Sequence, residues 1–182
     1  MEKNWLIDLF EKQYKFDNFI IEKNNSTVNL NDILNAYYVE VGEFLNEVRA
    51  FKHWSCKEMS KVESYEEFVD GLHFLLSIGN YCWGLDKVGV FARSLEERLE
   101  RIEPEELNLY KGKDDKYKDR FVSRSVGLFK YSNTLHGTLE DYIDYFVAYM
   151  RLGFNVGMSI EDIVLEYNKK HEINYLRQKQ GY

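Results

Sequence analysis

A chain of 182 residues with 45% hydrophobic and 16% aromatic side chains can bury a core of its own, which excludes an intrinsically disordered protein. Its formal net charge of −7 argues against a general nucleic-acid-binding protein, because such proteins present a basic face. Charges interrupt the apolar residues of the N-terminus, and no run of about 18 apolar residues follows. We therefore expect a cytoplasmic protein with no membrane partner. Its two cysteines lack metal-type spacing and are expected to be reduced thiols.

The chain is predicted to be an all-α, single-domain helical bundle that spans residues 1–182. Pro104 is the only proline, and long stretches contain no cluster of turn-forming residues. Three N-caps are predicted: Asn29 or Asn31 for the second helix, Ser64, with Glu67, for the third, and Ser159, with Asp162, for the last. The helices are expected at residues 3–22, from the Asn cap to about 54, from a Ser64–Glu67 capping box to 83, at 85–103, at 139–157 and from 159 onward.

Residues 104–120 are polar and rich in charge, and they are expected to form a loop or a weakly helical insertion. The third helix is apolar nearly all round and should be buried.

Carboxylates occur in two pairs on consecutive predicted helices. Glu40 and Glu43 stand three residues apart on the second helix, as do Glu67 and Asp70 on the third. A single pair of this kind is usually only a solvated helix face. Two pairs facing each other across antiparallel helices, one of them on a buried helix without Lys or Arg, instead favour a bound cation. Four oxygen ligands suit Mg²⁺, with Mn²⁺ as a possible substitute.

The C-terminal residues have the opposite charge. Residues 168–182 carry four cationic side chains against Glu172 alone, which gives them +3 and leaves −10 on the rest of the chain. Taken alone, this segment could be a solvated terminus or a binding segment for anions.

Three motifs resemble those of the dimeric, all-α dUTPases, a family within the all-α nucleotide pyrophosphatase superfamily. The residues EVGEFLNEVRAFKHWS and YEEFVDGLHFLLS are similar to its metal-binding core, and LFEKQYKFDN is similar to its uracil-side helix. The tail KHEINYLRQKQGY has the spacing Lys-x-x-x-Asn-x-x-Arg-Gln-x-x-Gly-Tyr that this family uses around the nucleotide. Residues from about 85 to 130 have no specific match.

The resemblance implies a dUTP diphosphatase, active on dUTP and also on dUDP, with two or more Mg²⁺ ions per site. It assigns the metal ligands to Glu40, Glu43, Glu67 and Asp70. Glu43 would also act as the general base for a water that attacks the β-phosphorus and yields dUMP and pyrophosphate. The implied contacts to the nucleotide are Gln13, Asp17, Lys52, Trp54, Lys170, Asn174, Arg177 and Tyr182.

Several of these residues also have plainer interpretations. Gln13 could be an exposed helix residue, Trp54 could belong to a core or interface, and Glu47 could be solvated or could support Glu43. His73 could orient Asp70, although a core histidine is the simpler interpretation.

Two other functions stay open at this point. A related helical pyrophosphatase could act on dCTP or on several nucleotides, and a phage-type dUTPase could also bind a repressor protein through residues 85–130. A homodimer is expected because the family is dimeric and because residues 142–150, in the fifth predicted helix, are rich in aromatic side chains.

Overall fold

The computed structural model describes residues 4–102 and 115–181, and within these ranges it contains α-helices, one 3₁₀ turn and no strand. The all-α prediction is confirmed. The helices are α1 (Trp5–Asn24), α2 (Leu30–Val48), α3 (Lys61–Trp83), α4 (Leu85–Glu100), α5 (Asp115–Lys130), α6 (Leu139–Asn155) and α7 (Ile160–Lys179), and the 3₁₀ turn η2 is Ser132–Thr134. No helix in these ranges has the length and apolar character needed to span a bilayer.

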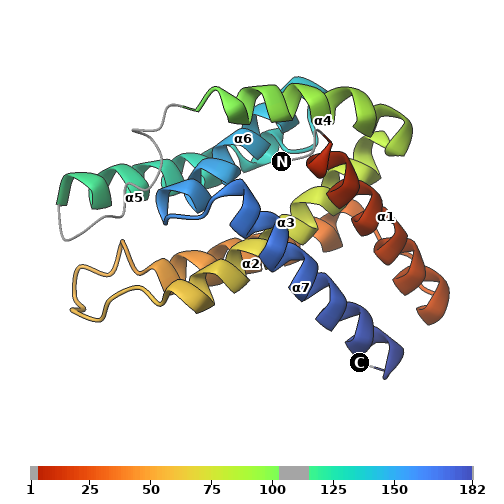
Figure 1. The fold of residues 1–182 in the computed structure, drawn as a ribbon, viewed down its shortest axis with the longest axis horizontal. Coiled ribbons are helices and arrows are strands. Elements are labelled where there is room, and N and C mark those ends of the chain that lie inside the picture. Colours follow the sequence, from red (N-terminus) through yellow and green to blue (C-terminus); the bar gives the residue numbers. More distant parts are fainter. Residues whose placement is uncertain (1–3, 103–114, 182) are drawn as a thin grey trace.

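Helix α3 is the centre of the fold. It packs against α1, α2, α4, α6 and α7, and α2 is its most extensive neighbour. In Figure 1, α2 lies at the lower left, α3 crosses the centre toward the upper right, α4 runs along the top, α5 lies at the left, and α1 and α7 extend toward the lower right. Since α3 has neighbours on all sides, it can be apolar nearly all round, as its sequence predicted.

Two tyrosines of α6 make equivalent contacts with α3. Each phenol donates a hydrogen bond to a backbone carbonyl of α3, and each lies where a glycine of α3 leaves room for it. The sets are Tyr149 with the Phe68 carbonyl (2.7 Å) and Gly71, and Tyr142 with the Leu75 carbonyl (2.9 Å) and Gly79. These buried hydroxyls are thereby satisfied, and the two helices can approach closely.

Two predicted N-caps are confirmed. Asn29 and Asp32 form a capping box at the start of α2, and Ser159 and Asp162 form one at the start of α7. The predicted cap at Ser64 is wrong, because α3 already begins at Lys61 and the buried Ser64 hydroxyl donates to the Lys61 carbonyl instead.

One helix boundary and one whole helix also differ from the prediction. Helix α2 ends at Val48 because Arg49 adopts the left-handed conformation (φ 61°), so residues 49–60 form a loop. Residues 115–120, predicted as part of a loop or weak insertion, are the first residues of α5. That helix buries Phe121, Ser125 and Leu128, which share one face at helical spacing. Pro104 lies outside the described residues.

Candidate active site

Three of the four predicted carboxylates come together where α2 faces α3. Glu40, Glu67 and Asp70 each offer an oxygen atom within 4.8 Å of the others. The i, i+3 spacing puts both acids of α3 on one face, and Gly71 keeps the helices close: a Cβ atom there would lie 3.7 Å from that of Glu40. A set of oxygen donors at this spacing can hold a divalent metal ion.

Glu43 lies at the rim of this acidic cluster. Its side chain is exposed, and it does not belong to the close group of three. Its charge nevertheless raises the pKa of both Glu40 and Glu67, so it lies near them. This position, beside the cluster and open to solvent, suits a group that has to exchange a proton with water.

The cluster resists ionisation. Burial, followed by repulsion from Asp70, Glu43 and Glu67, raises the pKa of Glu40 to about 7. Burial and neighbouring carboxylates also raise the pKa of Glu67. A cation would relieve both effects, because it would neutralise the repulsion and replace lost hydration.

A cationic side chain contacts the cluster from α7. Lys170 Nζ lies 2.6 Å from Asp70 Oδ2, and both side chains are mostly buried. Burial still dominates, so the pKa of Asp70 is raised despite the opposing effect of Lys170. Sequence reasoning found no Lys or Arg near these acids on their own helix, and the fold supplies one from the other end of the chain.

A cavity of about 320 Å³ adjoins the cluster and collects most of the predicted nucleotide contacts. Helices α1, α2, α3 and α7 all contribute to its wall. Its lining includes the predicted residues Gln13, Asp17, Glu40, Asp70, Lys170, Asn174 and Arg177. The lining therefore combines carboxylates of α1, α2 and α3 with an amide of α1 and cationic side chains of α7.

Gln13 is held in this wall by hydrogen bonds at both ends of its amide. The Tyr167 hydroxyl donates to Oε1 at 2.8 Å, and Nε2 donates to Asp17 Oδ1 at 2.8 Å. Gln13 is only 3% exposed, so the interpretation as an exposed helix residue is wrong. Burial raises the pKa of Asp17 to about 6, against the opposing effect of hydrogen bonds from Ser77 and Gln13.

His73 is a core histidine and makes no hydrogen bond to Asp70. Its Nδ1 donates to the Val69 carbonyl at 2.6 Å, and its ring stacks on that of Tyr167 with the centroids 4.1 Å apart. Burial lowers the pKa of His73 to about 3, so the imidazole is neutral at ordinary pH.

Two of the predicted nucleotide contacts lie elsewhere. Lys52 and Trp54 belong to the α2–α3 loop and do not line the cavity. Lys52 donates to Asn46 Oδ1, and Trp54 is 68% exposed with its ring against His53. Tyr182 lies outside the described residues.

Sequence reasoning missed the apolar part of the cavity wall, which consists of Phe16, Ile20 and Phe74. Phe16 and Ile20 follow Gln13 by three and seven residues, so they share its helical face, and Phe74 follows Asp70 by four. That spacing was the available signal. Tyr167 gave none, because it acts through Gln13 from a separate helix.

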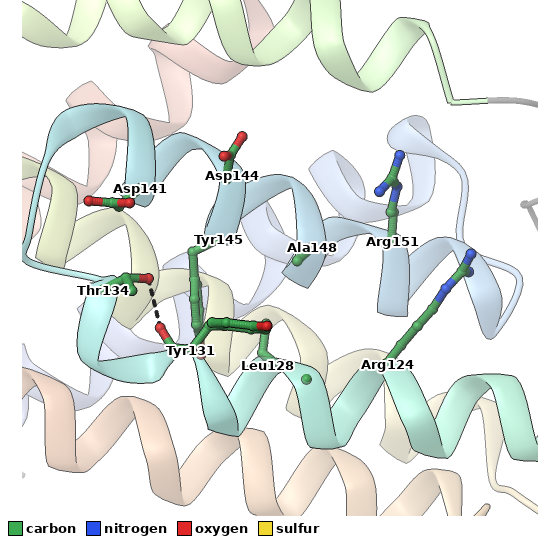
Figure 2. Close-up of a pocket in the computed structure, with 10 residues that line it drawn as sticks. Arg124, Leu128, Tyr131, Thr134, Asp141, Asp144, Tyr145, Ala148 and Arg151 are labelled. Atoms are coloured by element: carbon green, nitrogen blue, oxygen red, sulfur yellow. Dashed lines mark hydrogen bonds between the residues drawn. The ribbon is translucent and has the colours of Figure 1, made fainter.

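A larger cavity, of about 400 Å³, lies between α5 and α6 (Figure 2). None of the predicted site residues lines it. Its two acidic wall residues are already engaged, Asp141 in a capping box with Thr138 and Asp144 in an ion pair with Arg98. The smaller cavity is the better candidate active site because, among the described cavities, it is the one whose lining includes members of the carboxylate cluster, Glu40 and Asp70.

The all-α fold, with clustered carboxylates beside lysine and arginine at one cavity, has the features of a helical hydrolase for phosphate compounds. A model of the family described as dUTPase matches residues 5–182, nearly the whole chain. The chain therefore belongs to the dUTPase family, and it is a hydrolase of the dUTP diphosphatase class. No curated protein matches the chain.

Proposed function

We propose that the protein hydrolyses dUTP, and also dUDP, with Mg²⁺ at the acidic cluster, and that dUTP yields dUMP and pyrophosphate. One observation carries the proposal: a single cavity joins the carboxylates of α2 and α3 to Lys170, Asn174 and Arg177 of α7 and to Gln13 of α1. A cellular role follows from this chemistry, because removing dUTP keeps uracil out of DNA and supplies dUMP. We place this activity in the cytoplasm.

Glu40, Glu67 and Asp70 would hold the metal, with Glu43 as the fourth ligand and two or more ions per site. The residues fit Mg²⁺ or Mn²⁺, because all donors are oxygen, and because burial and mutual repulsion, which raise the pKa of Glu40 and Glu67, would both be offset by a bound cation. When bound, the ions would neutralise phosphate charge and make a water molecule more acidic.

The side chains divide the remaining work. Glu43 accepts the proton of the attacking water, while Lys170 and Arg177 hold phosphate oxygens, Arg177 through its planar guanidinium. Gln13, positioned by Asp17, reads the uracil edge, and Asn174 contacts the sugar or base.

Three further contacts belong to the proposal. Tyr182 would close over the nucleotide, and Lys52 and Trp54 would reach it only if the loop of residues 49–60 moved toward the cavity.

Residues 1–182 would act as one dUTPase-like domain, including the segment around 85–130. Within that segment α4 packs on α1 and α6, and α5 packs on α6. This packing supports the view that the segment belongs to the same domain.

We propose a homodimer as well. The aromatic residues of α6 that first suggested it, among them Tyr142 and Tyr149, are buried inside the protomer and cannot form the interface. Helix α5 is a better candidate, because Val126 and Phe129 are 60% and 42% exposed, and Tyr131 just beyond it is 55% exposed. Analytical ultracentrifugation at micromolar concentration should give twice the chain mass of 21.8 kDa, and a mass of one chain would contradict the proposal.

The activity is tested by phosphate release from dUTP, dUDP, dCTP and dTTP with Mg²⁺ and a coupling pyrophosphatase. We expect dUTP to be the preferred triphosphate. A preference for dCTP, or equal use of several nucleotides, would instead identify a related helical pyrophosphatase. Absence of hydrolysis of any of them would leave a purely regulatory protein, such as a repressor-binding one.

Glu43→Gln tests the assignment of the base. The substitution keeps the shape of the side chain but removes its ability to accept a proton, so kcat should fall by about 10²- to 10⁴-fold. The circular dichroism spectrum should be unchanged. The melting temperature of the metal-free protein should not decrease, because the substitution removes one of the mutually repelling charges. A kcat within threefold of the wild type would assign the base elsewhere.

A further inference from the structure

The Gln13 amide is asymmetric, and its two ends have different neighbours. Its oxygen faces the Tyr167 hydroxyl and its nitrogen faces the Asp17 carboxylate, each at 2.8 Å. Tyr167 is fully buried, and the stacking of its ring on His73 fixes it further. The wall of the cavity therefore holds this amide in one position and in one sense, that is, with its oxygen toward Tyr167 and its nitrogen toward Asp17.

The two neighbours constrain the amide differently. A phenol can donate or accept a hydrogen bond, so Tyr167 would tolerate either end of the amide. An ionised carboxylate can only accept, and with a pKa of about 6 Asp17 is mostly ionised at neutral pH. If the amide turned over, its oxygen would face the carboxylate, and two acceptors would lie in contact.

The sense of this amide matters because uracil and cytosine differ by an exchange of donor and acceptor. Uracil offers N3–H as a donor beside the C4 carbonyl as an acceptor, whereas cytosine offers N3 as an acceptor beside an amino donor. The Gln13 amide retains one N–H and one oxygen lone pair beyond its two bonds in the wall. In one sense it matches uracil, and turned over it matches cytosine in the same pose.

We infer that Asp17 determines the choice of uracil over cytosine by fixing the sense of the Gln13 amide, and that Tyr167 fixes only its position. The inference rests on the proposed function, since it assumes that this cavity receives the base of the nucleotide. Asp17 is thus a positioning residue that acts through Gln13 and has no need to touch the base. A site that leaves a buried polar group unmatched rejects the wrong ligand strongly, which gives such a device its discriminating power.

Asp17→Asn is the decisive substitution. Asparagine has the same shape but can donate or accept, so both senses of the Gln13 amide become available. We expect the ratio of kcat/KM for dUTP to that for dCTP to fall at least tenfold, with a lower KM for dCTP. Tyr167→Phe should lower kcat/KM for dUTP severalfold without any gain for dCTP, because the carboxylate still sets the sense.

Two controls separate this role from simpler ones. Tyr142→Phe also removes a buried phenol bonded to a carbonyl, but it lies outside the cavity lining and should leave the ratio unchanged. In a Gln13→Ala background, Asp17→Asn should have no further effect on the ratio, because the amide through which it acts is gone.

The outcomes are distinct. If Asp17→Asn lowers the use of both nucleotides by the same factor, or if its effect on the ratio persists without Gln13, the inference is overturned. Calorimetric affinities for dUMP and dCMP report the same selectivity for any variant that is too slow to assay. If the wild-type enzyme fails to hydrolyse dUTP, the proposed function fails instead.

Discussion

At the scale of single residues, Glu40 shows how strongly the site depends on a cation. Its pKa of about 7 results mainly from burial and then from three neighbouring carboxylates. A carboxyl group that is this reluctant to ionise makes the metal-free fold less stable at neutral pH, and it makes metal binding release protons.

The stability of the metal-free protein should therefore depend on pH through Glu40. Because its folded-state pKa lies above the usual value of 4.5, the folded state binds this proton more tightly than the unfolded state. The stabilisation is complete below about pH 4.5 and is lost as pH rises through about 7. With allowance for partial exposure, the loss should be about 1 to 2 kcal/mol.

Urea unfolding with a chelator at pH 5 and pH 8 measures this effect. The wild type should lose stability relative to Glu40→Gln over that interval, since the variant carries no titrating group there. Parallel pH profiles for the two proteins would contradict the raised pKa of Glu40.

Lys170 is the cation that the fold itself brings to the cluster. Because it forms an ion pair with Asp70 at 2.6 Å, it competes with a metal ion for that carboxylate. Lys170→Met should therefore tighten Mn²⁺ binding about five- to tenfold, or about 1 kcal/mol, while kcat/KM for dUTP falls because a phosphate contact is lost.

Isothermal titration calorimetry with Mn²⁺ measures the expected gain in metal affinity, and steady-state kinetics with dUTP measure the expected loss of kcat/KM. Lys169→Met is the matched control, because that exposed lysine pairs with Glu166 and should leave both quantities unchanged. Weaker Mn²⁺ binding by Lys170→Met would show that the ion pair organises the metal ligands and does not compete with the metal.

At the scale of helices, the approach of α6 to α3 decides how the carboxylates are presented. Tyr149 bonds to the carbonyl of Phe68, between the two acids of α3, and occupies the space left by Gly71. Gly71 follows Asp70 directly, so the same short stretch of α3 carries both the metal ligands and the contact that fixes them.

Gly71→Ala should therefore destabilise the protein by about 1 to 3 kcal/mol, because the new methyl group would overlap the Tyr149 hydroxyl. Gly42→Ala is the control: that glycine lies on the exposed face of α2 with nothing within 4 Å of an added Cβ, and the change should stabilise by about 0.5 to 1 kcal/mol. Chemical denaturation measures both. A neutral Gly71→Ala would mean that the helices separate without cost.

The sequence predicts helices better than it predicts their ends. Periodicity identified α2 and the buried α3, and local capping motifs placed the starts of α2 and α7. Helix α2 ends just before Arg49, which adopts a left-handed conformation although no glycine or proline at this position indicates a helix end. Helix α5 was not among the predicted helices, because its first residues are charged and only its later ones carry the apolar face.

The site was predictable where spacing along one helix defines it, as for Glu67 and Asp70. Contacts between distant helices were not, because spacing along the chain carries no information about them. The Lys170–Asp70 ion pair and the Tyr167–Gln13 hydrogen bond both join residues about a hundred or more positions apart.

At the scale of the whole molecule, charge is separated between an acidic body and a cationic C-terminal end. Helix α7 buries Ile163 and Tyr167 in its first half, while its later residues are exposed or half-buried. The second half is therefore available for a ligand, and the first half anchors it.

Removal of residues 174–182 should consequently leave the metal site intact and impair turnover. The loss of charge-assisted contacts, each worth about 1.5 to 3 kcal/mol, should reduce kcat/KM for dUTP at least a hundredfold. Lys179→Ala is the control, because its ammonium group lies 4.5 Å from the centre of the Tyr175 ring and outside the cavity lining. Near-native kcat/KM for the truncated enzyme at saturating Mg²⁺ would show that the segment is only a solvated terminus.

The pairing of tyrosines with glycines between α6 and α3 also limits how this chain can evolve. A larger residue at Gly71 or Gly79 becomes acceptable only after the facing tyrosine has become smaller, and a lost phenol leaves a gap that the glycine cannot fill. Neither the glycine nor the tyrosine of a pair can therefore be substituted independently of the other. Among related sequences, the two members of each pair should therefore change together, and the order of such changes should run through the loss of the hydroxyl first.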